Sequence, residues 1–575
     1  MTIDLVTTEV VSSRLREIAS MMEYALYHSG YSTILRESKD GTAGLTDAEG
    51  RAIIIGGGLQ YHFLAYQRAV RCVLDRFPAD QLRPGDSFVA NDPYQCGTAH
   101  APDLVAITPA FYDDRVIGFA VSIAHKADIG GLVPGSSGAA AREIYHDGLL
   151  LPAVRFRTAA GPNGDVEAII RNNSRIPDVV LGDLRAQVGC TGLGVARLAG
   201  LCDEYGVGAV RDTMASILTL TKRRLAAELR GWTDGTAEAE GFLDHDGVAK
   251  DRPVRIHVRA TKQADRLVLD FSDCSPQTAG PVNLTSCTAQ AVSLLALLTT
   301  ADPTIPVNLG IADAVDFIQP AGLVVNPQHP ATVNHYFPTG HLVYNCVLSA
   351  LGKLNPARAV APSGLGSGAV SIGYKRGRAG KPAVIYELLI TSLGATSRHD
   401  GAAIVQAIDH ITPGAPVEII ETEYPIRVRS FDIWRDSGGP GRFRGGIGHV
   451  RELEVLADST LTVRSANHRF TAGGVNGGFS PKASRIVLNP DLVEREELEP
   501  IQTRPLVAGD VIRFERSGGA GFGPPWERDR AAVLDDVRNG YVSADSALLI
   551  YRVEAVPESG AGPEVAGHKG ASDEQ

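Results

Sequence analysis

Two short apolar runs separated by polar residues constrain the fold of this chain more than any other feature. Residues 104–107 (LVAI) and 116–121 (VIGFAV) have the composition of β-strands, and residues 112–115 (YDDR) between them suit a hairpin loop. The pattern predicts an antiparallel hairpin in which 104–111 pairs with 116–123. Such a hairpin also determines which residues beyond its open end face each other.

Three side chains that can bind a metal flank this open end. The numbers of facing residues in the predicted hairpin add up to about 227, which places His125 opposite approximately Pro102. This register brings His100, Asp103 and His125 together. Two imidazoles and a carboxylate suit Zn, Mn or Fe and leave an open position for water.

Spacing alone leaves a structural interpretation open. A His-x-x-Asp step is common, and paired histidines in loops are more often exposed or hydrogen-bonded structural residues than metal ligands. If a metal does bind, a further carboxylate from Asp40 or Asp128 can complete its ligands or their surroundings. Cys96, beside the cluster, is expected to be a packed thiol rather than a nucleophile.

The composition disfavours several classes of protein. Lys and Arg number 55 against 66 Asp and Glu, a net charge of −11, so no basic excess favours nucleic acid. The apolar run 291–298 is far shorter than the roughly 18 residues of a membrane span. The N-terminus has no signal-peptide pattern, the seven cysteines form no CxxC pair, and no P-loop motif occurs. We therefore expect a soluble, cytoplasmic protein without a membrane partner.

Apolar periodicity predicts several further elements. Residues 181–230 are predicted to be mostly helical, with interruptions at 189–194 and 205–208, where glycines gather. Helices are also expected at 10–26, 63–77 and 289–298, and strands at 254–258 and 267–271. Residues 87–90 form a short apolar run that leads into a loop.

These elements predict an α+β fold, because helices and strands do not alternate regularly enough for a TIM barrel or a Rossmann fold. We expect a large mixed fold of four regions. They are an N-terminal α/β metal-binding catalytic region (1–230), a central mixed α/β region (231–418), a glycine-rich C-terminal β region (419–556) and a disordered tail (557–575).

Longer motifs carry a more specific signal, and they occur along nearly the whole chain. They are 35–40 (LRESKD), 91–94 (NDPY), 100–103 (HAPD), 125–131 (HKADIGG), 134–136 (PGS), 171–177 (RNNSRIP), 182–187 (GDLRAQ), 436–446 (DSGGPGRFRGG), 518–525 (GGAGFGPP) and 536–541 (DVRNGY). In these motifs and their order the chain resembles the hydantoinase B/5-oxoprolinase family. Other branches of that family include the alpha-type subunits of acetone carboxylase and related ketone carboxylases.

The resemblance implies a two-component, ATP-dependent hydrolase of cyclic amides such as a hydantoin, 5-oxoproline or caprolactam. A separate A-type subunit, of the actin-like ATPase kind, would use ATP to phosphorylate the carbonyl oxygen of the substrate. This chain would then complete the hydrolysis at its own metal centre. The two subunits would form a hetero-oligomer such as α2β2.

The resemblance also implies which residues act. The metal ligands of the family fall on Asp40, His100, Asp103 and His125, for one divalent transition metal: Zn, or alternatively Mn or Fe. Such an ion would lower the pKa of a bound water. Two further residues, Asp128 and His146, are candidates for a catalytic proton shuttle.

Many relatives have Gly-Gly-Thr-His where this chain has residues 96–100 (CGTAH), which contain Cys96 and one extra residue. The chain also departs from the family pattern in residues 334–341. Segment 334–341 either tunes the substrate or is ordinary packing. Two alternative functions stay open: an alpha-type subunit of a ketone (acetone or acetophenone) carboxylase, and a non-catalytic scaffold for the ATPase partner. A bicarbonate requirement would indicate the carboxylase, and activity that survives loss of His125 would indicate the scaffold.

Overall fold

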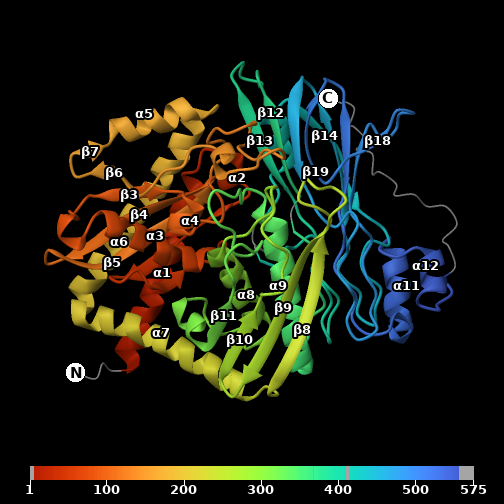
Figure 1. Ribbon diagram of the computed structural model, residues 1–575, viewed down its shortest axis with the longest axis horizontal. Coiled ribbons are helices and arrows are strands. Elements are labelled where there is room, and N and C mark those ends of the chain that lie inside the picture. Colours follow the sequence, from red (N-terminus) through yellow and green to blue (C-terminus); the bar gives the residue numbers. More distant parts are fainter. Residues whose placement is uncertain (1–4, 367, 409–412, 556–575) are drawn as a thin grey trace, which may run out of the picture.

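The computed structural model describes residues 5–366, 368–408 and 413–555, which form helices and several β-sheets (Figure 1). The N-terminal sheet and its helices lie on one side of the molecule, and two C-terminal sheets lie on the other. The predicted α+β class is confirmed. The predicted disordered tail, 557–575, lies outside the described residues.

The N-terminal layer is a seven-stranded sheet with helices on both faces. Its strands, in the spatial order β2-β1-β5-β4-β3-β6-β7, are β1 (Gly41–Asp47), β2 (Ala52–Ile55), β3 (Ser87–Ala90), β4 (Asp103–Tyr112), β5 (Arg115–His125), β6 (Val154–Thr158) and β7 (Gly161–Pro162). The helices of this part are α1 (Leu5–His28), α2 (Thr33–Arg36), α3 (Phe63–Arg76), α4 (Pro93–Cys96), α5 (Gly164–Asn173), α6 (Pro177–Tyr205) and α7 (Val207–Arg230).

Successive side chains of a β-strand point to opposite faces of the sheet, so alternate residues of β4 and β5 pack against different helices. Val105 and Ile107 share a buried cluster with α3, whereas Ala120 and Ala124 share one with α1 and α6. The sheet is thus covered on both faces, which explains why β4 and β5 are buried along most of their length.

The predicted hairpin is confirmed, and its register differs from the expectation by one residue. Phe111 pairs with Val116, as predicted. A β-bulge follows, because Ala110 then pairs with Gly118 and Ile117 is left as the extra residue. His125 consequently faces Asp103 instead of Pro102.

The predicted interruption of the long helix at 189–194 is wrong, because α6 continues through it. A Cβ atom built on Gly189 or Gly192 would meet no atom within 4 Å, whereas one on Gly194 would lie 2.4 Å from Sδ of Met22. Gly194 therefore permits close packing of α6 on α1. The second predicted interruption is confirmed at Gly206, whose φ is +83°, between α6 and α7.

A second sheet, in the order β11-β10-β9-β8, follows in the chain and packs against two buried helices. The strands are β8 (Gly235–Leu243), β9 (Val254–Gln263), β10 (Arg266–Asp270) and β11 (Val315–Ile318), and the helices are α8 (Ser286–Thr300) and α9 (Tyr336–Leu354). The helices predicted at 63–77 and 289–298 correspond to α3 and α8, and the strands predicted at 254–258 and 267–271 to β9 and β10.

The C-terminal part is a sandwich of two sheets with one shared apolar core. One sheet contains β13 (Ala383–Leu389), β12 (Gly368–Tyr374), β16 (Ser459–Arg464) and β19 (Ile501–Leu506); the other contains β14 (Ile426–Ile433), β15 (His449–Val455), β20 (Val511–Glu515), β17 (Arg485–Leu488) and β18 (Glu496–Glu497). Helices α10 (Val417–Glu423), α11 (Arg530–Arg538) and α12 (Ala544–Leu549) complete this part. The first sheet joins strands from both sides of the predicted boundary at 418/419, and the division into regions stays a prediction.

The glycine-rich motifs pack backbone against backbone. A Cβ atom on Gly445 would lie only 1.9 Å from the carbonyl oxygen of Gly519. Beside this contact, the guanidinium groups of Arg444 and Arg528 both bind the buried carboxylate of Asp536, which attaches α11 to the sandwich. Of the helices within the described ranges, none is both long and apolar enough to cross a membrane.

Candidate metal centre

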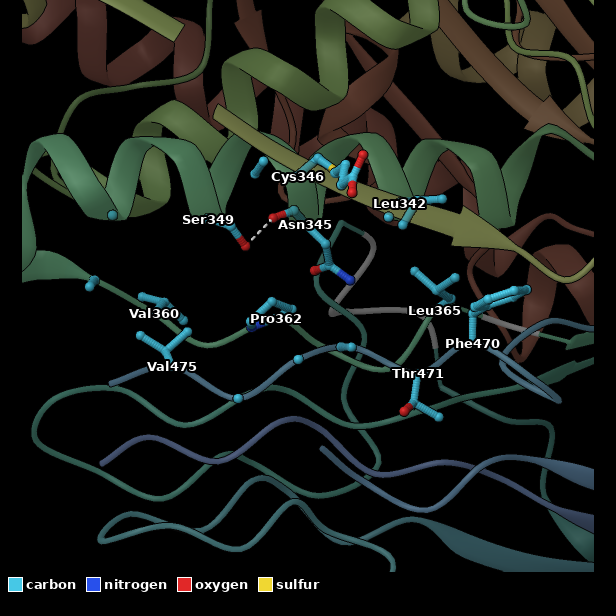
Figure 2. A pocket seen from close by; sticks show the side chains of 18 of the residues that line it. Leu342, Asn345, Cys346, Ser349, Val360, Pro362, Leu365, Phe470, Thr471 and Val475 are labelled. Atoms are coloured by element: carbon cyan, nitrogen blue, oxygen red, sulfur yellow. Dashed lines mark hydrogen bonds between the residues drawn. The ribbon is translucent and has the colours of Figure 1, made fainter. Parts of the chain in front are cut away.

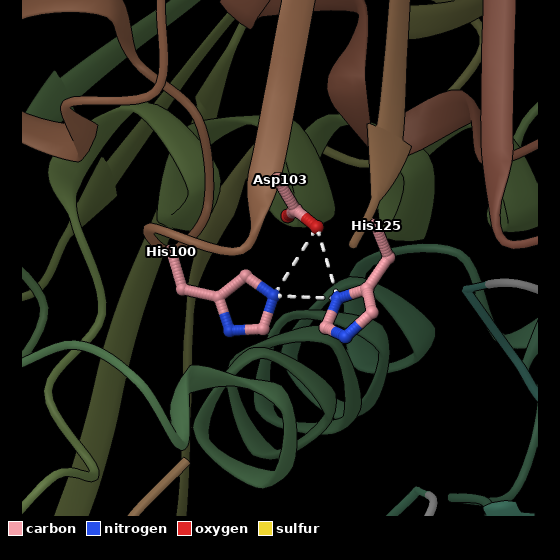
Figure 3. A group of neighbouring side chains, drawn as sticks. All are labelled: His100, Asp103 and His125. Carbon is pink, nitrogen blue, oxygen red and sulfur yellow. Dashed lines mark hydrogen bonds and ion pairs between the residues drawn. The ribbon is translucent and has the colours of Figure 1, made fainter. Parts of the chain in front are cut away.

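Three side chains converge at the open end of the β4–β5 hairpin (Figure 3). Nε2 of His100 lies 3.1 Å from Oδ1 of Asp103 and 3.1 Å from Nδ1 of His125, and the last two atoms are 3.4 Å apart. All three side chains are buried. The cluster that the sequence predicts is present.

The hydrogen bonds of His100 show why these atoms suit a cation. Nδ1 of His100 lies 3.0 Å from the backbone oxygen of Asn334, which can only accept. In the neutral imidazole, Nε2 of His100 is therefore an acceptor, and it faces the carboxylate of Asp103. A proton on Nδ1 of His125 can form a hydrogen bond to Nε2 of His100 or to Oδ1 of Asp103, but not to both. A cation between the three atoms can bind all of them.

The distances also fit metal coordination. Ligand atoms about 2.0–2.1 Å from a tetrahedral ion lie about 3.3–3.4 Å apart, close to the spacing in this cluster. Oδ2 of Asp103 is buried and has no hydrogen-bond partner in the described structure. The residues present therefore fit a divalent metal, and the donor set suits Zn, Mn and Fe alike.

Charge and burial shift the pKa values within the cluster. Burial alone would raise the pKa of Asp103, but His100 and His125 outweigh it and hold that pKa well below its usual range. Burial lowers the pKa of His125 to about 4. Burial also acts to lower the pKa of His100, yet Asp103 outweighs burial and raises it. Asp103 is thus ionised and His125 neutral at neutral pH, the forms that bind metals.

Residues near the hairpin hold His100 in place. The side chain of Asn91, in the NDPY motif, donates to the carbonyl oxygens of Ala101 (2.6 Å) and Leu149 (2.8 Å). Its Oδ1 atom accepts from the N–H of Leu151 at 2.6 Å. These bonds tie the loop that carries His100 to a neighbouring segment, which gives this motif a structural role.

The cluster borders a small cavity between three parts of the fold. The ring of Tyr336, on α9, lies 4.9 Å from that of His100, and the ring of Tyr386, on β13, lies 4.5 Å from that of His125. Arg464, at the end of β16, forms a further wall. The cavity has a volume of about 30 Å³, approximately the share of one water molecule in the liquid. A cyclic substrate can therefore reach the cluster only after wall side chains move.

Asp40 lines the same cavity, but its carboxylate is outside the three-atom cluster. Its backbone oxygen accepts a hydrogen bond from the N–H of His125 at 3.1 Å. The structure thus brings Asp40 beside the centre, and its assignment as a ligand stays a prediction.

Asp128 and His146 do not line this cavity. The carboxylate of Asp128 accepts hydrogen bonds from the N–H groups of Gly130, Gly135 and Arg175 and from the guanidinium of Arg175, each at 3.0 or 3.1 Å. Nδ1 of His146 accepts from the N–H of Arg142. This geometry offers no support for either residue as a proton shuttle, and that assignment stays a prediction.

Sequence analysis missed three residues near the centre. Asp147 is buried, its carboxylate accepts from the hydroxyl of Thr332, and burial raises its pKa to about 7. Tyr386 and Arg464 belong to strands of the distant sandwich, and no local pattern marks them. The segment 334–341, by contrast, was noted, and its first four residues line the cavity.

Cys96 is a packed thiol, as expected. It is fully buried, and its Sγ atom lies 2.8 Å from Sγ of Cys72 on α3. It does not line the cavity.

A larger cavity, of about 590 Å³, lies further along α9 (Figure 2). Leu342, Asn345, Cys346 and Ser349 of α9 line one side, and residues 470–476 line the other. None of the three clustered side chains lines it, so this cavity is separate from the candidate metal centre, although α9 borders both.

The comparisons with known proteins extend these observations to the whole chain. The family model described as hydantoinase B/oxoprolinase matches residues 4–525. The chain belongs to the hydantoinase B/oxoprolinase family. The resemblance seen in the sequence motifs is thereby confirmed.

Members of this family are similar to the chain over nearly its full length. The caprolactamase subunit beta of Pseudomonas jessenii is 30% identical over 570 residues, covering 96% of both proteins. The crystal structure of ATP-dependent caprolactamase from Pseudomonas jessenii superposes with a TM-score of 0.89 at 27% identity, over 97% of each chain. A nucleotide-free structure of acetone carboxylase gives a TM-score of 0.88 at 19% identity, over 95% of this chain and 79% of the other, and shows the shared fold.

Proposed function

We propose that this chain is the hydrolytic subunit of a two-component, ATP-dependent cyclic amide hydrolase. Membership of the hydantoinase B/oxoprolinase family and similarity to a caprolactamase subunit support this proposal. The substrate would be a hydantoin, 5-oxoproline or a lactam such as caprolactam. The partner would be an A-type subunit that uses ATP, in a hetero-oligomer.

The observation that carries the proposal is the convergence of three acceptor atoms from His100, Asp103 and His125 in a buried site. A divalent transition metal held there, Zn or alternatively Mn or Fe, would lower the pKa of water and polarise an oxygen of the substrate. A non-catalytic scaffold has no need of such a site.

The division of labour between the subunits follows from amide chemistry. A cyclic amide without ring strain resists hydrolysis, because its resonance must be lost. Phosphorylation of the carbonyl oxygen by the partner makes the carbonyl carbon electrophilic. A water would then add to this carbon, and the ring C–N bond would break as the nitrogen takes up a proton, which leaves an acyl phosphate. A second water would hydrolyse the acyl phosphate to the carboxylate and inorganic phosphate.

The residues of this chain contribute orientation and exclusion of bulk water. The carbonyl of Asn334 holds the imidazole of His100 so that Nε2 faces the centre. The rings of Tyr336 and Tyr386 pack on the two imidazoles and limit the space for solvent. This preorganised arrangement needs little movement of the ligands when the substrate is bound.

The test combines metal analysis with turnover. The chain is co-purified with an A-type subunit, and ATP-dependent opening of hydantoin, 5-oxoproline and caprolactam is measured with and without bicarbonate. We expect about one equivalent of metal and opening of one of these rings without bicarbonate, both lost in His125→Ala. His28→Ala, an exposed histidine on α1, is the matched control and keeps both.

Two results would contradict the proposal. A complex that forms normally and keeps full activity in His125→Ala would indicate a scaffold. Turnover of a ketone that depends on bicarbonate would indicate a carboxylase.

A further inference from the structure

Arg464 places two buried nitrogens without hydrogen-bond partners among the described residues at the wall of the candidate metal centre. It is the last residue of β16, its exposed fraction is 2%, and it lines the same cavity as His100 and His125. Two of its nitrogens, Nε and Nη2, are buried without a hydrogen-bond partner in the described part of the chain. Buried donors without partners are costly, so a protein that keeps them has a use for them.

The contacts of Arg464 leave one edge of the guanidinium free. Its Nη1 atom lies 3.5 Å from Oδ1 of Asn334, and the group lies over the ring of Tyr386, 4.8 Å from the centroid. Nε and Nη2 are buried and have no hydrogen-bond partner in the described part of the chain. These two atoms form a single edge of the planar group, the edge that binds both oxygens of a phosphate or carboxylate in parallel.

Arg516 shows that the free edge is not a general property of buried arginines here. It is also fully buried, but its Nη1 donates to the hydroxyl of Ser465 and its Nη2 to the carbonyl of Gly366 at 2.9 Å. Those bonds give Arg516 a structural role. By contrast, Nε and Nη2 of Arg464 have no hydrogen-bond partner within the described residues.

The charge balance of the cavity favours an anion. A divalent cation at the centre and the guanidinium of Arg464 would together bring three positive charges to this region. Asp40, which lines the cavity, and Asp103, in the cluster, can supply at most two negative charges. A loaded centre therefore attracts a negatively charged group to the side where Arg464 lies.

We propose that Arg464 binds the phosphoryl group of the activated substrate through its Nε–Nη2 edge. This inference rests on the proposed function, which supplies a substrate phosphorylated on its carbonyl oxygen. The residue would hold the phosphoryl group while the ring carbon faces the metal centre, and it would hold inorganic phosphate after the reaction. A carboxylate on a substrate such as 5-oxoproline offers the same pair of oxygens, and the test separates the two sources.

The first experiment measures binding without turnover. Inorganic phosphate is titrated into the metal-loaded chain by calorimetry, with acetate as the carboxylate probe. We expect phosphate to bind at least about tenfold more weakly to Arg464→Gln than to the wild type, with the metal content and melting temperature unchanged. Arg464→Lys keeps the charge but not the paired edge, and is expected to give an intermediate affinity.

Several results would overturn the inference. One is equal phosphate affinity in the wild type and in Arg464→Gln. Another is the absence of phosphate binding by the metal-loaded wild type. A third is loss of the metal from both variants, which would show that Arg464 stabilises the metal centre. Should Arg464→Gln fail to fold, Arg464→Lys alone decides the matter.

A second experiment separates the sources of the anion and the two proposals. In the complex with the A-type subunit, Arg464→Gln should slow opening of caprolactam, which has no carboxylate, as well as that of 5-oxoproline. If ring opening slows for 5-oxoproline alone, Arg464 binds the substrate carboxylate, and the inference is overturned. If the complex opens no cyclic amide at all, the proposed function fails. The phosphate titration still tests whether Arg464 binds a phosphate group.

Discussion

Nδ1 of His100 donates a hydrogen bond to the backbone carbonyl of Asn334, which lies 234 residues later in the chain. Every residue has a backbone carbonyl, so this bond does not depend on which side chain occupies position 334. It depends on the path of the chain just before α9. It directs the other ring nitrogen toward Asp103 and joins the N-terminal sheet to the central helices. The geometry of the centre is therefore a property of the assembled fold.

Asp103→Asn is predicted to remove the metal. The amide keeps the volume of the side chain but loses the negative charge that both histidines face. Metal affinity should fall by more than the roughly 10–100-fold typical of a lost outer-shell partner. Elemental mass spectrometry and competition with a chelator measure this loss, and Asp128→Asn, outside the cavity, is the comparison. Equal affinity in wild type and Asp103→Asn would show that Asp103 is not a ligand.

Metal affinity is predicted to decrease as the pH falls. Asp103 raises the pKa of His100, so the metal-free centre takes up a proton on His100 more readily than a free histidine does. A metal must displace that proton, and below the raised pKa each unit of pH should weaken binding up to about tenfold. Zinc titrations at pH 6, 7 and 8 measure the slope. An affinity that does not change with pH would contradict the role of His100.

Gly189→Ala is predicted to stabilise the protein and Gly194→Ala to destabilise it. Gly189 is exposed on α6 with free space around it, so alanine should add about 0.5–1 kcal/mol to the free energy of unfolding. At Gly194 the new Cβ would collide with the buried Met22, at a cost of about 1–3 kcal/mol. Denaturant unfolding of both variants measures the difference, and the same sign for both would contradict the packing described for α6.

Asp147→Asn is predicted to flatten the dependence of stability on pH. Burial raises the pKa of Asp147 from 3.8 to about 7 in the folded protein. Between these values the folded state binds more protons than the unfolded state, so the free energy of unfolding falls as the pH rises, by up to about 1.4 kcal/mol per unit. The amide resembles the protonated acid and does not titrate. Unfolding at pH 5 and pH 8 should therefore differ less in Asp147→Asn than in the wild type.

Asp536→Asn is predicted to weaken the attachment of α11. The carboxylate accepts four hydrogen bonds, at 2.8–3.2 Å, from the buried guanidinium groups of Arg444 and Arg528. Its neutralisation leaves the buried Arg444 without its ion-pair partner, at a cost of about 3–5 kcal/mol, whereas Arg528 keeps its bonds to Asp400. Asp535→Asn, on the exposed side of the same helix, should change the free energy of unfolding little. Thermal unfolding of the two variants compares them, and equal stability would rule out this role.

The amino-acid sequence by itself determined the α+β class, the long N-terminal helices, the β4–β5 hairpin and the convergence of His100, Asp103 and His125. Strand pairing follows from the local alternation of apolar residues and the length of a loop, so the hairpin places His100, Asp103 and His125 together without knowledge of the rest. The error of one residue came from the bulge at Ile117, because neither composition nor spacing marks where an extra residue enters a strand.

Only the tertiary structure decided what surrounds that cluster. Tyr386 and Arg464 reach it from the sandwich and Asn334 from the chain before α9, because separate layers meet there, and such contacts leave no periodic trace in the sequence. The tertiary contacts also decided that Asp128 binds Arg175 and the loop from Gly130 to Gly135 instead of facing the cavity. A local pattern can specify which side chains a hairpin brings together. The space around them, and the charge that faces them, depend on how distant layers pack.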